Sequence, residues 1–499
     1  MSTPLHVVIA GGGTAGWMAA NLFAALCPKE RVRVTLVESP DIGIIGVGEG
    51  STPTLKRFFE IIKVPEQVWM PTCNATYKVG IKFNDWSPKS GIHSYRHPFI
   101  SQTDIFTQRA FEVNCHTRRL GLDTHTRPED FLINGVLAKK NLGPLTPAHF
   151  PFTIQYGYHF DSALLGQFLS EHAQKQGVTH IKKGILAVKT HPDTSIASLL
   201  CDDDTEISGD FFIDCTGFRS LLLQQTLGVQ FKSYKSNLFN DSAVVLPTSI
   251  SNTIPSETEA TALSAGWCWR IPLQNRFGNG YVYSAEYLSP DSAEEEFRRH
   301  LGILDSDDSC RHLSMKVGQV EQHWKKNCLA LGLSQGFIEP LEATALHLVQ
   351  ICAEMFISKW QQGDYSSTHQ QAFNAFAKER FDRVRDYIVA HYKLNTREDS
   401  EYWRDNREND AISSSLANII NCWFQRKDLT QEIKRQDIGM HWDPISWHCL
   451  FSGYGAYPPL APDQPGKGDH FAEKNIDTFV QGCALNFESH NANLASLLE

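Results

Sequence analysis

The sequence contains no apolar run that reaches the roughly 18 residues of a membrane-spanning helix. It has no basic run, and its formal net charge is −10, so no nucleic-acid partner is expected. The twelve cysteines form no CxxC pair and the twenty histidines form no HExxH motif, which argues against a zinc site and a disulfide framework. The first apolar run leads directly into glycines, unlike a signal peptide. We therefore expect a cytoplasmic protein without a metal, membrane or nucleic-acid partner.

What is present is the composition of a large globular protein. The 499 residues are 41% hydrophobic and 20% charged, which is enough for a large core. The beginning of the chain predicts a strand at His6–Ala10, an alanine-rich helix at Trp17–Cys27 and a second strand at Arg31–Val37. Because a glycine turn separates the first strand from the helix, this order predicts an α/β fold with a dinucleotide-binding core.

The glycine turn reads GGGTAG. Gly11 allows a tight turn, Gly13 lets a pyrophosphate approach the backbone, and Gly16 lets the helix pack closely on the strand. The helix N-terminus then faces the phosphates. Glu38, about twenty residues further on, can accept hydrogen bonds from ribose hydroxyls. The sequence therefore predicts a dinucleotide site, which also includes Thr14 and Ala15.

Two further segments are expected to lie along the same cofactor. Residues 42–53 form a second glycine-rich run, for which a surface loop is the alternative. Residues 329–333 form an apolar strand that leads into a glycine turn and an apolar helix, whose N-terminus is expected to face a ligand. Four residues from these segments are predicted to contact the cofactor: Glu49, Gly50, Leu333 and Leu346.

The segment GWCWRIP carries two tryptophans in a predicted strand. Alternation places Trp267 and Trp269 on one face and Cys268 on the other. Pro272 then removes a backbone donor and ends the strand. An ordinary core strand is the alternative, because tryptophan is a large hydrophobe with good strand propensity.

Helical periodicity dominates after about Ser367. The apolar residues that recur at helical spacing are predicted to be core: Phe373, Phe376, Phe381, Val384, Tyr387 and Ile388.

Together these segments resemble the flavin-dependent tryptophan halogenase family. The resemblance is carried by GGGTAG, VGEGSTP, YKVGIKF, WCWRIP and GFIEPLEAT, spread from residue 11 to about 345, and more weakly by SWHCLFSGYGAYP. It implies a flavin monooxygenase-like fold in which residues 1–355 form a discontinuous FAD-binding core with inserted sheet segments. Residues 356–499 would form a mainly helical module that covers the substrate. It also implies that Trp267 and Trp269 lie beside the flavin.

The segment YKVGIKF offers two lysines, Lys78 and Lys82, which would share one face of a single strand. A lysine can hold hypohalous acid by a hydrogen bond from its ammonium group, or form a haloamine as the free amine. The resemblance implies that Lys78 is catalytic and Lys82 is not. A solvated lysine pair at a strand edge is the alternative.

The segment GFIEPLEAT supplies the remaining chemistry. A carboxylate near the halogenated carbon stabilises the cationic intermediate and takes its proton. The resemblance selects Glu342 for this role, and Glu339 is expected to be structural. It also implies that the amides of Thr344 and Ala345 bind halide at a helix N-terminus. The family reads Ser-Thr-Gly after the glutamate, whereas this chain reads Ala-Thr-Ala, so these amides serve only if φ at Ala345 stays negative.

His97 and Phe99 match an element that lines the indole pocket of the family, although His97 could also be an ordinary loop histidine. Family members that act on free tryptophan carry a Tyr-Tyr pair, a glutamate and a Phe-Trp-Asn run late in the chain. Here Trp442 matches the tryptophan, but His441 and Asp443 replace its neighbours and the Tyr-Tyr pair is missing. Because such a site lacks polar partners for an amino acid, we expect indole or a larger indole-containing molecule rather than free tryptophan.

The predicted function is therefore FADH2-dependent halogenation of an indole-type ring with O2 and bromide or chloride. Because the chain has one GxGxxG motif, reduced flavin is expected from a separate NADH-dependent reductase, and a homodimer is also considered. Two alternatives stay open, a flavin-dependent aromatic monooxygenase and a non-enzymatic flavoprotein. Halide dependence separates the monooxygenase from the halogenase, and turnover separates the flavoprotein from both.

Overall fold

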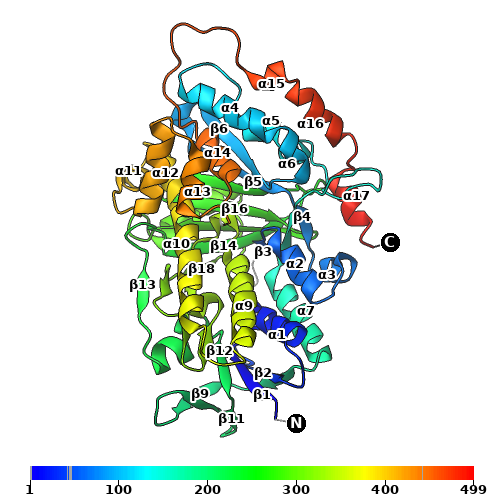
Figure 1. Ribbon diagram of the computed structural model, residues 1–499, viewed down its shortest axis with the longest axis vertical. Helices are drawn as coiled ribbons and strands as arrows, with labels where there is room; N and C mark the ends of the chain where they lie inside the picture. Colours follow the sequence, from blue (N-terminus) through cyan, green and yellow to red (C-terminus); the bar gives the residue numbers. More distant parts are fainter. Residues whose placement is uncertain (1–2, 42, 44–47, 441, 499) are drawn as a thin grey trace. The chain divides into compact units, whose positions relative to one another are not determined.

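A computed structural model describes residues 3–41, 43, 48–440 and 442–498 (Figure 1). The chain divides into two compact units, each built from three segments. Unit 1 comprises residues 1–75, 160–235 and 315–382, and unit 2 comprises residues 76–159, 236–314 and 383–499. The predicted boundary between residues 355 and 356 falls inside helix α9 (Ala345–Gln362), so the predicted domains divide the chain differently from these units.

Unit 1 is built on a sheet that is parallel except for one edge strand. In order across the sheet, its strands are β20 (Trp324–Lys325), β21 (Cys328–Ala330), β12 (Phe211–Asp214), β1 (Leu5–Ala10), β2 (Val32–Glu38) and β8 (Thr179–Lys182). Strand β1 is central and its side chains from Val7 to Ala10 are fully buried, as expected for a strand covered on both faces. The predicted strand–helix–strand order at the start of the chain is confirmed.

Helix α1 (Thr14–Leu26) follows the glycine turn of unit 1. It packs against α7 (Ser162–Lys175) and α9, which lie beside it in Figure 1. Unit 1 also contains α2 (Thr54–Ile61), α3 (Glu66–Thr72) and a sheet of β9 (Ile185–Thr190), β10 (Ile196–Cys201) and β11 (Glu206–Ser208). A third sheet joins β13 (Phe231–Ser233), β19 (Gly318–Val320) and β22 (Gly336–Phe337).

Unit 2 is built on a seven-stranded sheet in which only the β15–β5 pair is parallel. Its strands, in order, are β18 (Arg311–Ser314), β14 (Ser242–Ser249), β17 (Arg276–Tyr283), β16 (Gly266–Pro272), β15 (Thr258–Leu263), β5 (Gly80–Ser87) and β6 (Ile92–Pro98). Helix α8 (Pro290–Leu301) packs on β14 and β17. A separate short pair joins β4 (Thr76–Lys78) to the first residues of β7 (Gly157–Asp161).

The remaining elements of unit 2 are helices. They include α4 (Gln108–Arg119), α5 (Pro128–Phe131), α6 (Ile133–Lys139), α11 (Glu401–Glu408), α12 (Ser414–Phe424), α13 (Leu429–Gln436), α14 (Pro444–Gly453), α15 (His470–Glu473), α16 (Ile476–Ala484) and α17 (His490–Ala495). Helix α10 (Gln370–Leu394) begins in unit 1, ends in unit 2 and carries the predicted apolar stripe. Five of the six stripe residues are buried, and Phe376 is half-buried, so this prediction is largely confirmed.

Neither a metal nor a membrane is indicated by the described part of the chain. Those residues contain no cluster of three histidine, cysteine or carboxylate side chains that could hold a metal ion. None of their helices combines the length and apolarity that a bilayer crossing needs.

Candidate functional site

The glycine turn of unit 1 is shaped by close backbone approaches. Gly11 has φ +106°, and a Cβ there would lie 2.2 Å from the carbonyl oxygen of Cys215. A Cβ at Gly16 would lie 2.0 Å from the carbonyl oxygen of Gly11. By contrast, a Cβ at Gly13 would meet nothing within 4 Å. Gly11 and Gly16 are therefore required by packing, whereas Gly13 leaves the backbone open to an approaching group.

The N-terminus of α1 is placed to receive that group. The helix begins at Thr14, directly after Gly13, which has no side chain to cap it. The first amides of a helix have no partner within the helix and attract negative charge, as the pyrophosphate of a dinucleotide requires. Ala15 lies next to the turn Gly332–Ser334, because a Cβ at Gly332 would be 2.6 Å from that of Ala15. The turn and helix thus fit a dinucleotide cofactor.

Glu38 ends strand β2 beside the glycine turn. A Cβ at Gly12 would lie 1.6 Å from Oε2 of Glu38, so any side chain there would displace this carboxylate. The other carboxylate oxygen, Oε1, lies 2.7 Å from Nε2 of His180 in β8. The ring of Trp17 meets His180 edge-on at 4.9 Å. Sequence reasoning missed His180, because nothing in the segment THIK marks it.

Glu49 and Gly50 belong to the second glycine-rich run and form strand β3 (Gly48–Gly50) with Gly48. Both are half-buried. Burial raises the pKa of Glu49 to about 7, a hydrogen bond from Ser162 lowers it, and the charge of Asp161 raises it. Glu49 is thus poised to change charge near neutral pH. Residues 42 and 44–47 of the predicted run lie outside the described residues.

The segment GFIEPLEAT turns tightly into helix α9. Glu339 and Glu342 are both buried, and a short helical turn spans Pro340–Glu342. Ala343 then has φ +56°, in the left-handed region that favours glycine. Leu333 is half-buried in the preceding Gly332–Ser334 turn, and Leu346 is buried in α9.

Helix α9 begins at Ala345 and runs for 18 residues. Ala345 is therefore helical and its φ is negative, so the condition set by the Gly-to-Ala departure from the family is met. Thr344 precedes the helix, and its buried Oγ1 has no hydrogen-bond partner among the described residues. The amides of Thr344 and Ala345 thus stand at an anion-attracting helix end.

Ala343→Gly is expected to raise the free energy of unfolding by about 1 kcal/mol, because glycine adopts φ +56° without steric cost. Ala345→Gly is the matched control, since glycine in a helix costs about 0.5 kcal/mol. Thermal unfolding midpoints should therefore rank Ala343→Gly above the wild type and Ala345→Gly below it. The reverse order would mean that the left-handed turn at residue 343 carries no strain.

Lys78 ends strand β4 in unit 2 and is fully buried. It pairs across the strands with Gly157, which has no side chain. Its Nζ lies 5.6 Å from the centroid of the Phe99 ring, within reach of a cation–π interaction. The Phe99 amide donates to the carbonyl oxygen of Val79 at 3.0 Å, which keeps the ring beside the lysine.

The prediction that Lys78 and Lys82 share one strand is wrong. The chain leaves β4 at Val79, whose amide donates to the carbonyl oxygen of Ser256, and β5 begins at Gly80. Lys82 lies in the seven-stranded sheet, where its Nζ is 3.5 Å from Oε1 of Glu259. Its side chain is 25% exposed, so the two lysines differ in burial and in partner.

A cluster of aromatic rings surrounds Tyr387 in unit 2. Trp442 is half-buried, and its ring stacks on Tyr387 with centroids 3.7 Å apart and planes 9° apart. His97 is buried in β6, and its ring lies 6.1 Å from the Tyr387 ring. The structure thus joins two predicted substrate residues through Tyr387, which the sequence had assigned only to the core. His441 lies outside the described residues.

The two tryptophans of β16 share a face, as predicted. Their ring centroids are 6.1 Å apart, and both side chains are buried. Trp269 lies over Gly280 of β17, where a Cβ would be 2.1 Å from the ring. Cys268 points to the opposite face and packs in an apolar cluster with Phe297 of α8. Gly280 therefore makes room for the Trp269 ring.

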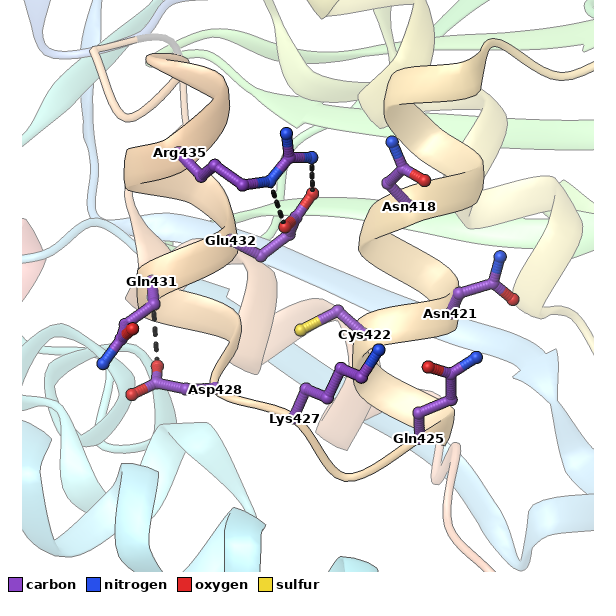
Figure 2. A pocket seen from close by; sticks show the side chains of 9 residues that line it. All are labelled: Asn418, Asn421, Cys422, Gln425, Lys427, Asp428, Gln431, Glu432 and Arg435. Carbon is purple, nitrogen blue, oxygen red and sulfur yellow. Dashed lines mark hydrogen bonds and ion pairs between the residues drawn. The ribbon is translucent and has the colours of Figure 1, made fainter.

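A cavity of about 550 Å³ opens between α12 and α13 (Figure 2). None of the predicted site residues lines it. Its Glu432 and Arg435 form a two-pronged ion pair at 2.6 and 2.8 Å, and Asp428 caps α13 by accepting from the Gln431 amide. The charges of Glu432 and Arg435 therefore neutralise one another, and we assign this cavity no function.

Comparison with known proteins gives consistent matches over the whole chain. The sequence model of the tryptophan halogenase family matches residues 6–464. The tryptophan 6-halogenase SttH of Streptomyces toxytricini is 37% identical over 93% of each chain. The 7-chloro-L-tryptophan 6-halogenase KtzR of Kutzneria sp. (strain 744) is 38% identical over 90% of each chain.

Solved structures agree with these matches. The crystal structure of SttH has a TM-score of 0.84 at 34% identity and covers 99% of this chain and 100% of that one. The flavin-dependent halogenase BrvH of Brevundimonas sp. BAL3 has a TM-score of 0.82 at 29% identity, covering 99% of this chain and 100% of that one.

Proposed function

Because the chain belongs to the flavin-dependent tryptophan halogenases, we propose that it halogenates the ring of an indole-type substrate that is not free tryptophan. Enzymes of this family have an FAD-binding dinucleotide fold and use FADH2. The observation that carries the proposed halogenation is the buried Lys78 beside Phe99, in a unit where the Tyr387 ring contacts those of His97 and Trp442. An aromatic cluster suits a flat arene, and a buried ammonium suits an oxidising halogen species.

Lys78 directs the halogenating agent. FADH2, O2 and halide, with a separate reductase to supply the reduced flavin, provide hypohalous acid. The Lys78 ammonium donates a hydrogen bond to this acid. Alternatively its free amine attacks the halogen, so that an N–halogen bond forms, the halogen–oxygen bond breaks and water leaves. Because the lysine is fully buried, it can do so with little competition from water.

Glu342 acts on the ring, and the helix end acts on the halide. A halogenated arene carries positive charge until it loses a proton, and a buried carboxylate both stabilises that charge and accepts the proton. The amides of Thr344 and Ala345 bind chloride or bromide at the start of α9. The methyl group of Ala345, where the family has glycine, narrows this halide site.

Most of the residues that would hold FAD lie in unit 1. The amides at the start of α1 bind the pyrophosphate, and Gly13 leaves room for it. Glu38, whose Oε1 is hydrogen-bonded to Nε2 of His180, would accept hydrogen bonds from the ribose hydroxyls. Glu49, Gly50, Leu333 and Leu346 would line the rest of the cofactor. Trp267 and Trp269, which belong to unit 2, are the residues proposed for its flavin ring.

Indole or an indole-containing molecule is proposed as substrate because the late segment lacks the partners that an amino-acid substrate needs. No Tyr-Tyr pair is present, and Asp443 caps α14 by accepting from the Ser446 amide, so its carboxylate already has a partner. Free tryptophan is the second candidate, because SttH is named a tryptophan 6-halogenase and KtzR a 7-chloro-L-tryptophan 6-halogenase.

The test compares kcat/KM for indole and for L-tryptophan, with a flavin reductase, NADH, FAD and bromide. The proposal predicts a value at least about tenfold higher for indole, since a site without polar partners gains nothing from the ammonium and carboxylate groups. A higher value for tryptophan would overturn the proposed substrate class while leaving the halogenase reaction in place.

Trp269→Ala is expected to shift the absorption spectrum and the fluorescence yield of bound FAD, because the proposal places this ring beside the flavin. Cys268→Ala is the matched control, since Cys268 points to the opposite face of β16. Difference spectra recorded at saturating FAD should change for the first variant and not for the second. If the two variants gave the same difference spectrum, the tryptophan pair would be ordinary core residues.

A further inference from the structure

The strand that carries Lys78 is tied to the seven-stranded sheet through the hydroxyl of Thr76. Thr76 Oγ1 donates to the carbonyl oxygen of Pro272 at 2.8 Å, at the end of the strand that holds the two tryptophans. The same oxygen lies 2.9 Å from Nδ1 of His159. A hydroxyl has one hydrogen, which is already used toward Pro272, so Thr76 accepts and Nδ1 of His159 donates.

The other side of His159 is also occupied. Its Nε2 lies 2.9 Å from Oγ1 of Thr258, the first residue of β15. Because Nδ1 carries the proton of the neutral ring, Nε2 is the acceptor and Thr258 donates. The chain of hydrogen bonds therefore runs from Thr258 to His159 to Thr76 to Pro272, and all three side chains are buried.

Strand geometry places this chain beside the lysine. Thr76 and Lys78 are two residues apart, so their side chains lie on one face of β4. His159 is opposite Thr76 in the β4–β7 pair, and Gly157 is opposite Lys78. The imidazole of His159 thus stands on the same face as the Lys78 side chain, with no bulk opposite the lysine itself.

Two further observations describe the charge around this histidine. Burial, the charge of Lys78 and that of His490 in α17 hold the pKa of His159 well below its usual value. His490 Nε2 accepts from the Tyr77 amide at 3.2 Å and its Nδ1 donates to the carbonyl oxygen of Ile254, and burial lowers its pKa to about 4. Both histidines that border β4 are therefore neutral at physiological pH.

We propose that His159, held between Thr76 and Thr258, is a positioning residue for Lys78. It keeps β4 in register with the ends of β15 and β16 while adding no positive charge beside the lysine. This inference rests on the proposed function, because it assumes that Lys78 handles the halogen. A reacting group that moves by about 1 Å costs up to about 100-fold in rate, so loosening this chain should lower kcat.

The test removes one hydroxyl without changing shape. Thr258→Val should lower kcat for halogenation about tenfold and leave KM and the dissociation constant of FAD unchanged. Thr258→Ser, which retains the hydroxyl, should restore kcat to within about twofold of the wild type. Thr76→Val and Thr76→Ser form a second pair, used in the same way if Thr258→Val does not fold by its thermal midpoint.

The outcomes separate the two claims. A loss of kcat in the valine variant with recovery in the serine variant supports the positioning role. Three results would overturn the positioning role. They are a wild-type kcat in a folded valine variant, an equal loss of kcat in the valine and serine variants, and a rise in KM in place of the loss of kcat. If Lys78→Ala itself retained halogenation, the proposed function would fail whatever Thr258→Val did.

Discussion

Lys78→Ala is expected to lower the rate of halogenation at least about 100-fold, which is the usual cost of deleting a group that stabilises a reacting centre. Lys78 is proposed to direct hypohalous acid from a fully buried position, which alanine cannot do. The dissociation constant of FAD should stay within about twofold of the wild-type value, because the lysine is not among the residues proposed to bind the cofactor. Product is measured by liquid chromatography with mass spectrometry.

Lys82→Ala is the matched control for this prediction. In the wild type, the Lys82 side chain is partly exposed and its ammonium group lies 3.5 Å from Glu259. Such an exposed ion pair contributes little to stability. We expect near wild-type halogenation from this variant. If Lys78→Ala kept more than a tenth of the wild-type rate, or if Lys82→Ala were the inactive one, the catalytic lysine would have been assigned incorrectly.

Glu342→Gln is expected to slow ring halogenation about 100-fold, within the range that a general base contributes. Glutamine has the same shape, but it carries no negative charge and cannot take the proton. Formation of hypohalous acid should continue, because Glu342 acts only on the ring. A small scavenger of hypohalous acid in the assay should therefore be halogenated at the wild-type rate while the indole product falls.

Glu342→Asp retains a carboxylate on a shorter side chain and should recover part of the lost rate. An unchanged rate in Glu342→Gln would move the base to another residue. Loss of scavenger halogenation together with product would instead place Glu342 in the step that generates the oxidant.

The parts of the fold set by local rules could be predicted from the sequence. The first strand, the glycine turn and the second strand follow from short-range sterics and apolar alternation, and the structure places them within one or two residues of the prediction. The shared face of Trp267 and Trp269 follows from the period of a strand. The apolar stripe of α10 follows from the helical period.

Contacts between distant segments could not be predicted. The break at Val79 exists because β4 pairs with β7, whereas β5 pairs with β15. Both β7 and β15 come from far along the chain. His159, His180 and Tyr387 acquire their roles only through such partners, so nothing adjacent to them in sequence marks them. The left-handed turn at Ala343 is likewise hidden, since alanine rarely adopts it.

The most direct test of the central claim is a halide-omission assay with indole. Purified protein, a flavin reductase, NADH and FAD are incubated with bromide, with chloride or with neither, and the products are identified by mass. The account predicts indole products that carry the isotope pattern of the added halogen, and no such product without halide. A hydroxylated product, or the same product in all three reactions, would contradict it and favour an aromatic monooxygenase.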